Sequence, residues 1–129
     1  MQKQNRMIAG IGIDLVSIGR MAEKIKERPF VEKVFGSLEQ AYCEASSRKE
    51  QHYAVRFAAK EAFLKATGKG LAAGYDLNNI EIVQDESGKP LITLSGNFKE
   101  MYQNEGWAAI HVSLSHEGDN AMAIVIIEK

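Results

Sequence analysis

The chain has 129 residues, of which 45% are hydrophobic and 26% charged, and its formal net charge is −1. This length predicts one domain with a core of its own, and the near-neutral charge argues against a nucleic-acid-binding surface, so any anion site must be local. The single cysteine, Cys43, excludes a disulfide within the chain and suits a reducing cytoplasm.

Residues 1–6 are polar and are expected to form an N-terminal extension ahead of a single domain at residues 7–129. They lack the apolar segment of a signal peptide. No apolar run in the chain approaches the roughly 18 residues of a membrane span. These features favour a cytoplasmic protein without a membrane partner.

The first half of the chain predicts a strand followed by three helices. Residues 8–16 form a short apolar run of strand type, and residues 17–28 carry apolar residues at helical spacing, with Pro29 expected to stop that helix. Ser37 opens a capping box that starts a short helix, which residues 46–48 break. Residues 49–67 predict one long helix that is apolar nearly all round and therefore buried, with Gly68 at its end.

The second half of the chain predicts two hairpins and a short helix. Residues 80–84 and 91–94 are strand-like and flank strong turn chemistry, and Asn97 is expected to cap a helix through Asn104. Residues 111–115 and 121–127 form the second hairpin, around a turn at 117–120. Without a steady β-α-β alternation, these elements predict an α+β domain, with a small antiparallel sheet and a long buried central helix.

Gly10 and Gly12 superficially suggest a dinucleotide-binding fingerprint. Leu15 stands where the third glycine of that motif belongs, and the glycines lie inside the strand rather than after it. We therefore expect them to admit a close neighbouring backbone instead.

Two acidic residues lie where apolar ones are expected. Asp14 ends the first strand, and Glu61 lies on the buried helix. Two converging carboxylates without an arginine partner indicate a hard divalent cation such as Mg²⁺. Two simpler interpretations stay open: Asp14 caps the following helix, and Glu61 pairs with Lys65 one turn away. Arg56 and Lys60 on the same helix need partners if buried, or are solvated if their side faces water.

A polar strand face and a glycine-flanked lysine are candidates for binding a phosphate or a base. His111, Ser113 and Ser115 share one face of their predicted strand, which suits binding better than hydrolysis because no nucleophile-elbow sequence is present. Lys69 and Gly70 follow the long helix, where they either form a plain C-terminal cap or present amides and an ammonium to a phosphate.

Three segments carry a resemblance to a known family: residues 10–16 (GIGIDLV), 56–66 (RFAAKEAFLKA) and 111–116 (HVSLSH). In this order and at these separations they resemble the holo-acyl-carrier-protein synthases, the small 4′-phosphopantetheinyl transferases of bacterial fatty-acid synthesis. The resemblance covers residues 7–129 and implies the 4′-phosphopantetheinyl transferase fold, a homotrimer and active sites at the subunit interfaces.

The resemblance also implies the reaction and its partners. A serine of an apo acyl carrier protein attacks the β-phosphate of coenzyme A, the carrier gains phosphopantetheine, and adenosine 3′,5′-bisphosphate leaves. Asp14 and Glu61 are then the expected Mg²⁺ ligands, and Lys65 stabilises charge on the leaving group. The base that accepts the proton of the carrier serine is then either Glu61 or a metal-bound water.

The remaining roles follow from the same resemblance. His111, Ser113 and Ser115 hold the nucleotide, and Lys69 with Gly70 lies near a phosphate. Arg20 and Lys24 contact the acidic surface of the carrier, and Arg56 helps either ligand. Two alternatives to this activity stay open. One is another metal-dependent enzyme of phosphorylated substrates, such as a trimeric cyclodiphosphate synthase, but that class needs histidine-rich metal ligands and only three histidines are present. The other is a non-enzymatic trimer that binds a nucleotide or coenzyme A.

Overall fold

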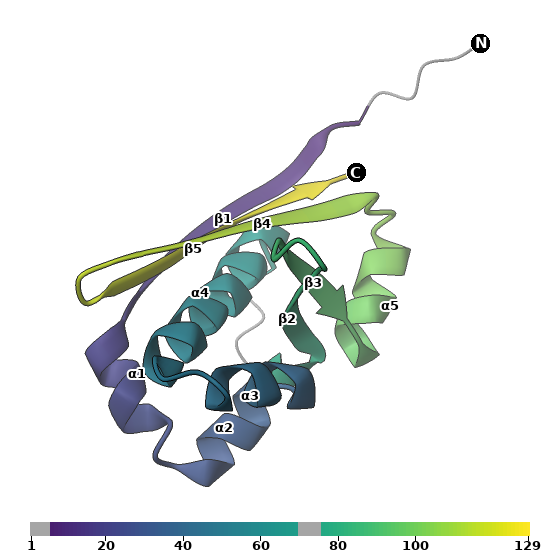
Figure 1. Cartoon of the computed structure of the whole chain (residues 1–129). Helices are drawn as coiled ribbons and strands as arrows, with labels where there is room; N and C mark the ends of the chain where they lie inside the picture. The colour runs from purple at the N-terminus through teal and green to yellow at the C-terminus, as the bar shows by residue number, and fades with distance from the viewer. Residues whose placement is uncertain (1–5, 70–75) are drawn as a thin grey trace.

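The computed structural model describes residues 6–69 and 76–129 and confirms an α+β domain (Figure 1). In chain order its elements are β1 (Ile8–Ser17), α1 (Ile18–Lys24), α2 (Arg28–Val34), α3 (Ser37–Glu44), α4 (Lys49–Thr67), the 3-10 helix η1 (Leu77–Asn79), β2 (Ile80–Gln84), β3 (Pro90–Leu94), α5 (Gly96–Asn104), β4 (Ala109–Glu117) and β5 (Asn120–Glu128). Across these two ranges, no helix combines the length and the apolar character needed to cross a membrane.

The sheet that positions the site has three antiparallel strands in the order β1-β5-β4, and β2 and β3 form a separate hairpin. The 19-residue helix α4 packs across one face of the three-stranded sheet, while α1, α2 and α3 gather around one end of α4 (Figure 1). The long buried central helix expected from the sequence is therefore confirmed.

Gly10 and Gly12 allow α4 to lie unusually close to β1. A Cβ built at Gly10 would lie 1.8 Å from the carbonyl oxygen of Ala66, and one at Gly12 would lie 1.9 Å from that of Ala62. No residue larger than glycine fits there without a backbone shift. The expectation of a close neighbouring backbone is confirmed.

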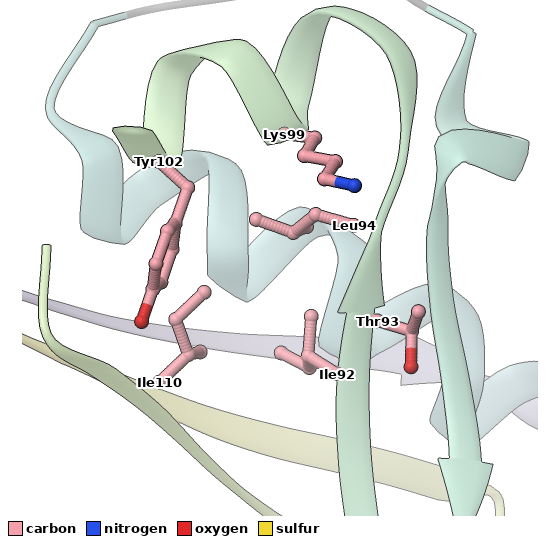
Figure 2. A pocket seen from close by; sticks show the side chains of 6 residues that line it. All are labelled: Ile92, Thr93, Leu94, Lys99, Tyr102 and Ile110. Carbon is pink, nitrogen blue, oxygen red and sulfur yellow. The ribbon is translucent and has the colours of Figure 1, made fainter. Parts of the chain in front are cut away.

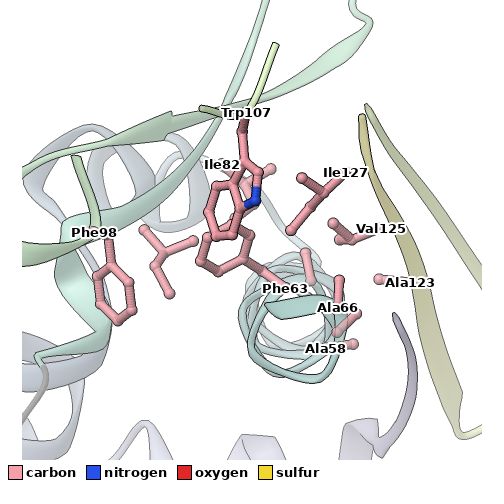
Figure 3. Packing of buried hydrophobic residues seen from close by; sticks show 12 residues of the cluster. Ala58, Phe63, Ala66, Ile82, Phe98, Trp107, Ala123, Val125 and Ile127 are labelled. Carbon is pink, nitrogen blue, oxygen red and sulfur yellow. The ribbon is translucent and has the colours of Figure 1, made fainter. Parts of the chain in front are cut away.

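The main core lies between α4, the sheet and the β2–β3 hairpin (Figure 3). Phe63 of α4 packs edge-on against Phe98 at 5.8 Å and Trp107 at 6.1 Å between ring centroids. From β5, Ala123, Val125 and Ile127 face the helix. Burial of this apolar surface is the main force that holds α4 against the sheet.

Helix boundaries are the part of the sequence prediction that needs correction. The predicted helix over residues 17–28 is two helices, because α1 ends at Lys24 and Pro29 lies in the first turn of α2. A proline has no N–H to lose at that position and its φ suits a helix start, so Pro29 begins a helix rather than stopping one. The N-cap of α5 is Ser95 rather than Asn97, and that of α3 is Gly36 rather than Ser37.

The sheet face away from α4 is apolar and uncovered in the single chain. Three side chains of β1 point there and are 55–59% exposed: Ile11, Ile13 and Leu15. The strand register places Ile126, Ile124 and Met122 of β5 beside them. A contiguous patch of this kind usually marks a contact with another protein surface.

Candidate functional site

A pocket of about 270 Å³ opens where β1, α1 and α4 meet. Its walls combine acidic, basic and apolar side chains: Asp14, Leu15, Val16, Ser17, Arg20, Met21, Lys24, Phe57 and Glu61. Four of the residues predicted from the sequence therefore line one cavity, namely Asp14, Glu61, Arg20 and Lys24.

Asp14 lies on the helix-facing side of β1, in the same alternation as Gly10 and Gly12. Its Oδ1 accepts a hydrogen bond from Lys65 Nζ at 3.0 Å, and the same ammonium donates to the Ile13 carbonyl at 3.0 Å. The Asp14 side chain is 17% exposed and that of Lys65 is 57% exposed. Asp14 does not cap α1, because Ser17 holds that place and accepts from the Arg20 amide.

Glu61 lies on α4 one turn before Lys65 and faces the same pocket. Partial burial raises the pKa of its carboxyl, the charge of Asp14 raises that pKa further, and Lys65 opposes both. Two carboxylates that disfavour each other's charge are relieved by a shared cation, so this pair fits a divalent metal.

The donor set also limits which metal suits the pocket. Within residues 6–69 and 76–129, no three His, Cys, Asp or Glu side chains cluster closely enough to form a metal cage. Two carboxylates alone suit Mg²⁺, which is usually held by one or two carboxylates, substrate phosphates and retained waters. They do not suit a structural zinc, which requires four protein ligands.

The basic wall of the pocket comes from α1. Arg20 and Lys24 are exposed and both line the pocket, and the Lys24 ammonium lies 5.4 Å from the centre of the Phe30 ring. Met21 anchors the other side of this short helix in the core. The arrangement presents positive charge at the mouth of a cavity whose interior holds two carboxylates.

Arg56 and Lys60 are both buried, which excludes the interpretation that they are solvated. The Arg56 guanidinium lies 4.4 Å from the centre of the Tyr42 ring, and its Nη1 donates to the His52 carbonyl at 3.2 Å. Among the described residues, Arg56 Nε has no hydrogen-bond partner. Arg56 lies outside the lining of the pocket.

Lys60 forms a buried ion pair that the sequence analysis missed. Its Nζ lies 2.6 Å from Glu39 Oε1 and also donates to the carbonyls of Leu77 and Ile80. Glu39 in turn accepts from the amides of Gly36 and Ile82 at 3.0 Å each. Burial raises the pKa of Glu39 and lowers that of Lys60, and their mutual attraction opposes both shifts.

This pair has a structural role, because it ties α3 and β2 to α4 and neither residue lines the pocket. Its sequence signal was present but ambiguous. Glu39 follows a helix start by three residues, which already explains a glutamate as a capping residue. No pattern in the sequence around Glu39 indicates that the same carboxylate also pairs with a buried lysine from another helix.

The residues of the third motif lie on the opposite side of the sheet from Asp14. His111, Ser113 and Ser115 pair across β5 with the outward-facing side chains, so they belong to the apolar outer face. His111 Nε2 contacts Glu128 Oε1 on that face. The structure therefore does not bring the His/Ser group together with Asp14 and Glu61 inside one chain.

Lys69 forms an ion pair with Glu105 at 3.0 Å, and both side chains are about 40% exposed. Gly68 before it has a φ of +67°, so it closes α4 as the left-handed cap expected from the sequence. Gly70 lies outside the described residues.

A second pocket of about 330 Å³ lies between β3, α5 and β4 (Figure 2). It is lined by Ile92, Thr93, Leu94, Lys99, Tyr102 and Ile110. Lys99 is the one charged residue in that lining, and no carboxylate accompanies it. The first pocket therefore has the better chemistry for a metal or for proton transfer.

Comparison with known proteins gives a consistent result. The family model described as "4′-phosphopantetheinyl transferase superfamily" matches residues 10–125. A holo-[acyl-carrier-protein] synthase of Geotalea daltonii is 42% identical over 125 residues, which cover 95% of this chain and all of the relative.

Solved structures agree with this relationship. The crystal structure of holo-[acyl-carrier-protein] synthase from Neisseria meningitidis has a TM-score of 0.87 at 33% identity, with 95% of this chain and 100% of that chain covered. The Bacillus anthracis holo-(acyl-carrier-protein) synthase in complex with CoA (3′,5′-ADP) has a TM-score of 0.77 at 32% identity, with 95% and 98% covered.

Proposed function

The chain belongs to the 4′-phosphopantetheinyl transferase superfamily and, within it, to the holo-[acyl-carrier-protein] synthases. We propose that its own residues carry out the transfer of phosphopantetheine as follows. The donor is coenzyme A, the acceptor is a serine of an apo acyl carrier protein, and adenosine 3′,5′-bisphosphate leaves. The observation that carries this proposal is the convergence of Asp14, Glu61 and Lys65 beside one pocket. Family membership also decides against the cyclodiphosphate synthase and the non-enzymatic trimer.

Asp14 and Glu61 are the residues that would hold Mg²⁺. The support is their shared pocket and the raised pKa of Glu61, which burial and the Asp14 charge produce. Bound there, Mg²⁺ supplies Lewis-acid stabilisation of negative charge on phosphoryl oxygens. Phosphoryl transfer depends mainly on positioning and charge stabilisation, which suits a site with few protein ligands.

Lys65 stabilises negative charge on the leaving group. Its side chain is 57% exposed, so the ammonium is free to leave Asp14 and reach a pyrophosphate at the pocket. Glu61 accepts the proton of the carrier serine, directly or through a water. Its position in the lining of the pocket where the serine must react supports this role.

The active enzyme is a homotrimer with its sites between subunits. The support is the uncovered face formed by Ile11, Ile13 and Leu15, which continues into His111, Ser113 and Ser115. Burying the apolar part of this face against a second copy would carry the polar part toward the neighbouring copy's pocket. His111, Ser113 and Ser115 then hold the nucleotide bound at the neighbouring Asp14 and Glu61.

Three further residues are assigned to the phosphates of coenzyme A. Lys69 is partly exposed and exchanges its ion pair with Glu105 for a phosphate. Gly70, the next residue in the sequence, is assigned to the same phosphate. Arg56 is buried but has an unpartnered Nε among the described residues, so it retains a donor for a phosphate.

Arg20 and Lys24 dock the carrier protein. They are exposed, lie on one short helix and border the pocket in which the serine must react. An acidic carrier surface would be steered to them by charge, and the attraction would weaken with salt. This reaction supplies the holo carrier for fatty-acid synthesis, and we place it in the cytoplasm.

Intact mass of an apo acyl carrier protein, after incubation with this protein, coenzyme A and Mg²⁺, tests the proposal. We expect a gain of one phosphopantetheine unit that is absent in EDTA and restored by excess Mg²⁺. A gain that persists in EDTA would refute the metal role of Asp14 and Glu61. No gain with a carrier that another transferase modifies would refute the donor and acceptor together.

A further inference from the structure

Asp119 lies in the turn between β4 and β5, yet its hydrogen bonds go to the start of α1. Its Oδ2 accepts from Ser17 Oγ at 2.7 Å, and its Oδ1 accepts from the Gly19 amide at 2.8 Å. The Asp119 carbonyl accepts from the Ile18 amide at 2.8 Å. Three consecutive residues at the N-terminus of α1 are thus bonded to one residue about 100 positions away.

The contact extends from Asp119 to the basic side chains of α1. Ser17, whose hydroxyl donates to Asp119, uses the same oxygen to accept from the Arg20 amide at 3.2 Å. The helix has seven residues, which is too short to persist in water without tertiary support. Asp119 and Ser17 therefore satisfy the amides of its first turn, while Met21 holds it from the core side.

We propose that Asp119 is a positioning residue for carrier docking: it holds α1 so that Arg20 and Lys24 face the pocket of Asp14 and Glu61. This inference rests on the proposed role of Arg20 and Lys24 in binding the carrier. Asp119 does not line the pocket and contacts neither Asp14 nor Glu61. It acts only through the helix that it caps.

The negative charge of Asp119 and its hydrogen bonds are expected to have opposite effects on carrier binding. Hydrogen bonds from Ser17 and Gly19 lower the pKa of the Asp119 carboxyl, with a further contribution from the Arg20 charge. The carboxylate is therefore ionised at neutral pH and adds negative charge beside a surface that binds an acidic partner. If charge were its whole effect, removing it would tighten carrier binding.

Two substitutions separate these effects. Asp119→Ala removes both side-chain hydrogen bonds, and we expect the carrier KM to rise about fivefold, the equivalent of about 1 kcal/mol for a lost helix cap. Asp119→Asn keeps an oxygen for the Gly19 amide and a polar group at Ser17 but removes the charge. Its carrier KM is expected at or below that of the wild type. In both variants the coenzyme A KM and kcat stay within about twofold of the wild type.

The other hairpin turn supplies a matched control. Asp85 is also an exposed turn aspartate whose carboxylate accepts several hydrogen bonds, but all come from its own turn, from Ser87 and Lys89. Asp85→Ala is expected to leave the carrier KM unchanged. In the Arg20→Ala background, Asp119→Ala should raise the carrier KM less than it does alone, because both changes act through the same docking contact.

Amide hydrogen exchange over residues 18–24 tests the anchor without any turnover. We expect faster exchange there in Asp119→Ala than in the wild type, with unchanged exchange in α4. Unchanged exchange in α1, or a carrier KM that falls equally in both variants, would overturn the proposal. Failure of the wild type to modify a carrier would instead overturn the proposed function, and the exchange result would still decide whether Asp119 anchors α1.

Discussion

Replacing Gly12 by alanine tests whether the close approach of α4 to β1 builds the pocket of Asp14 and Glu61. A Cβ at this position would lie 1.9 Å from the Ala62 carbonyl oxygen and 2.8 Å from the Ala66 amide nitrogen, whereas ordinary contact begins at 3.4 Å. Both neighbours are backbone atoms, so no side chain can rotate away. We expect the helix and the strand to separate by about 1.5 Å, because packed interiors have no spare room.

The cost of this separation follows from the packing. Overpacking a core costs about 1–3 kcal/mol, and a rigid backbone neighbour favours the upper end of that range. The smaller conformational entropy of alanine in the unfolded chain offsets about 0.4–1 kcal/mol. We therefore expect Gly12→Ala to lower the free energy of unfolding by about 2 kcal/mol.

The same separation should impair catalysis, since β1 carries Asp14 and α4 carries Glu61 and Lys65. A misplacement of about 1 Å costs about 100-fold in rate, so we expect a loss of that order in kcat/KM. Urea unfolding and carrier modification by intact mass measure the two effects, at a temperature where the variant is fully folded.

Gly88→Ala is the matched control. A Cβ at Gly88 meets no atom within 4 Å, but its φ is +89°, so alanine there is strained without touching α4. We expect a loss of about 1–2 kcal/mol with unchanged kcat/KM. If Gly12→Ala keeps the stability and the rate of the wild type, β1 accommodates the added methyl group by a small backbone shift. The close packing of α4 against β1 then does not position Asp14, Glu61 and Lys65. Equal rate losses in both variants would point to general destabilisation instead.

Four further predictions concern the charged groups. Asp14→Ala should abolish Mg²⁺-dependent turnover and weaken Mg²⁺ binding in calorimetry, while circular dichroism stays that of the wild type; turnover at the wild-type rate would remove Asp14 from the metal site. Because burial and the Asp14 charge raise the pKa of Glu61 above 4.5, the ionised carboxylate disfavours the metal-free fold. Glu61→Gln should therefore raise Tm in EDTA, by an increment that is absent below pH 4.5 and grows as pH rises through the raised pKa; an increment independent of pH would contradict this. Lys65→Ala should lower kcat more than it raises the carrier KM, and an unchanged kcat would exclude its role at the leaving group. Lys60→Met leaves Glu39 buried without its partner and should cost about 3–5 kcal/mol in urea unfolding; if the double variant with Glu39→Gln is no more stable than Lys60→Met alone, the cost comes from lost packing rather than from the unpaired charge.

Local patterns in the sequence were sufficient to predict most of the elements and to single out two unusual acids. The period of residues 49–67 predicted a buried helix, and the glycines of β1 predicted a close backbone, because both follow from side-chain size and spacing along one element. Asp14 and Glu61 were conspicuous as acids in apolar surroundings. The structure confirms the helix and the close approach and places the two acids in one pocket.

Helix ends were less predictable, because the same residue has opposite meanings at opposite ends of a helix. The sequence pattern predicts that Pro29 stops a helix, but in the folded chain it lies in the first turn of α2. Which meaning applies depends on whether the following residues find a surface to pack on. Val31 and Val34 of α2 do so, and both are buried.

Only the tertiary structure decided which distant residues meet. Alternation along β4 predicted that His111, Ser113 and Ser115 share a face, but the order β1-β5-β4 places that face away from Asp14. The buried Lys60–Glu39 pair and the capping of α1 by Asp119 likewise join segments far apart in the chain. Sequence periodicity predicts how a side chain is oriented relative to its own helix or strand. Contacts between distant segments depend instead on how helices and strands pack against one another. That packing is determined by the burial of the whole apolar core.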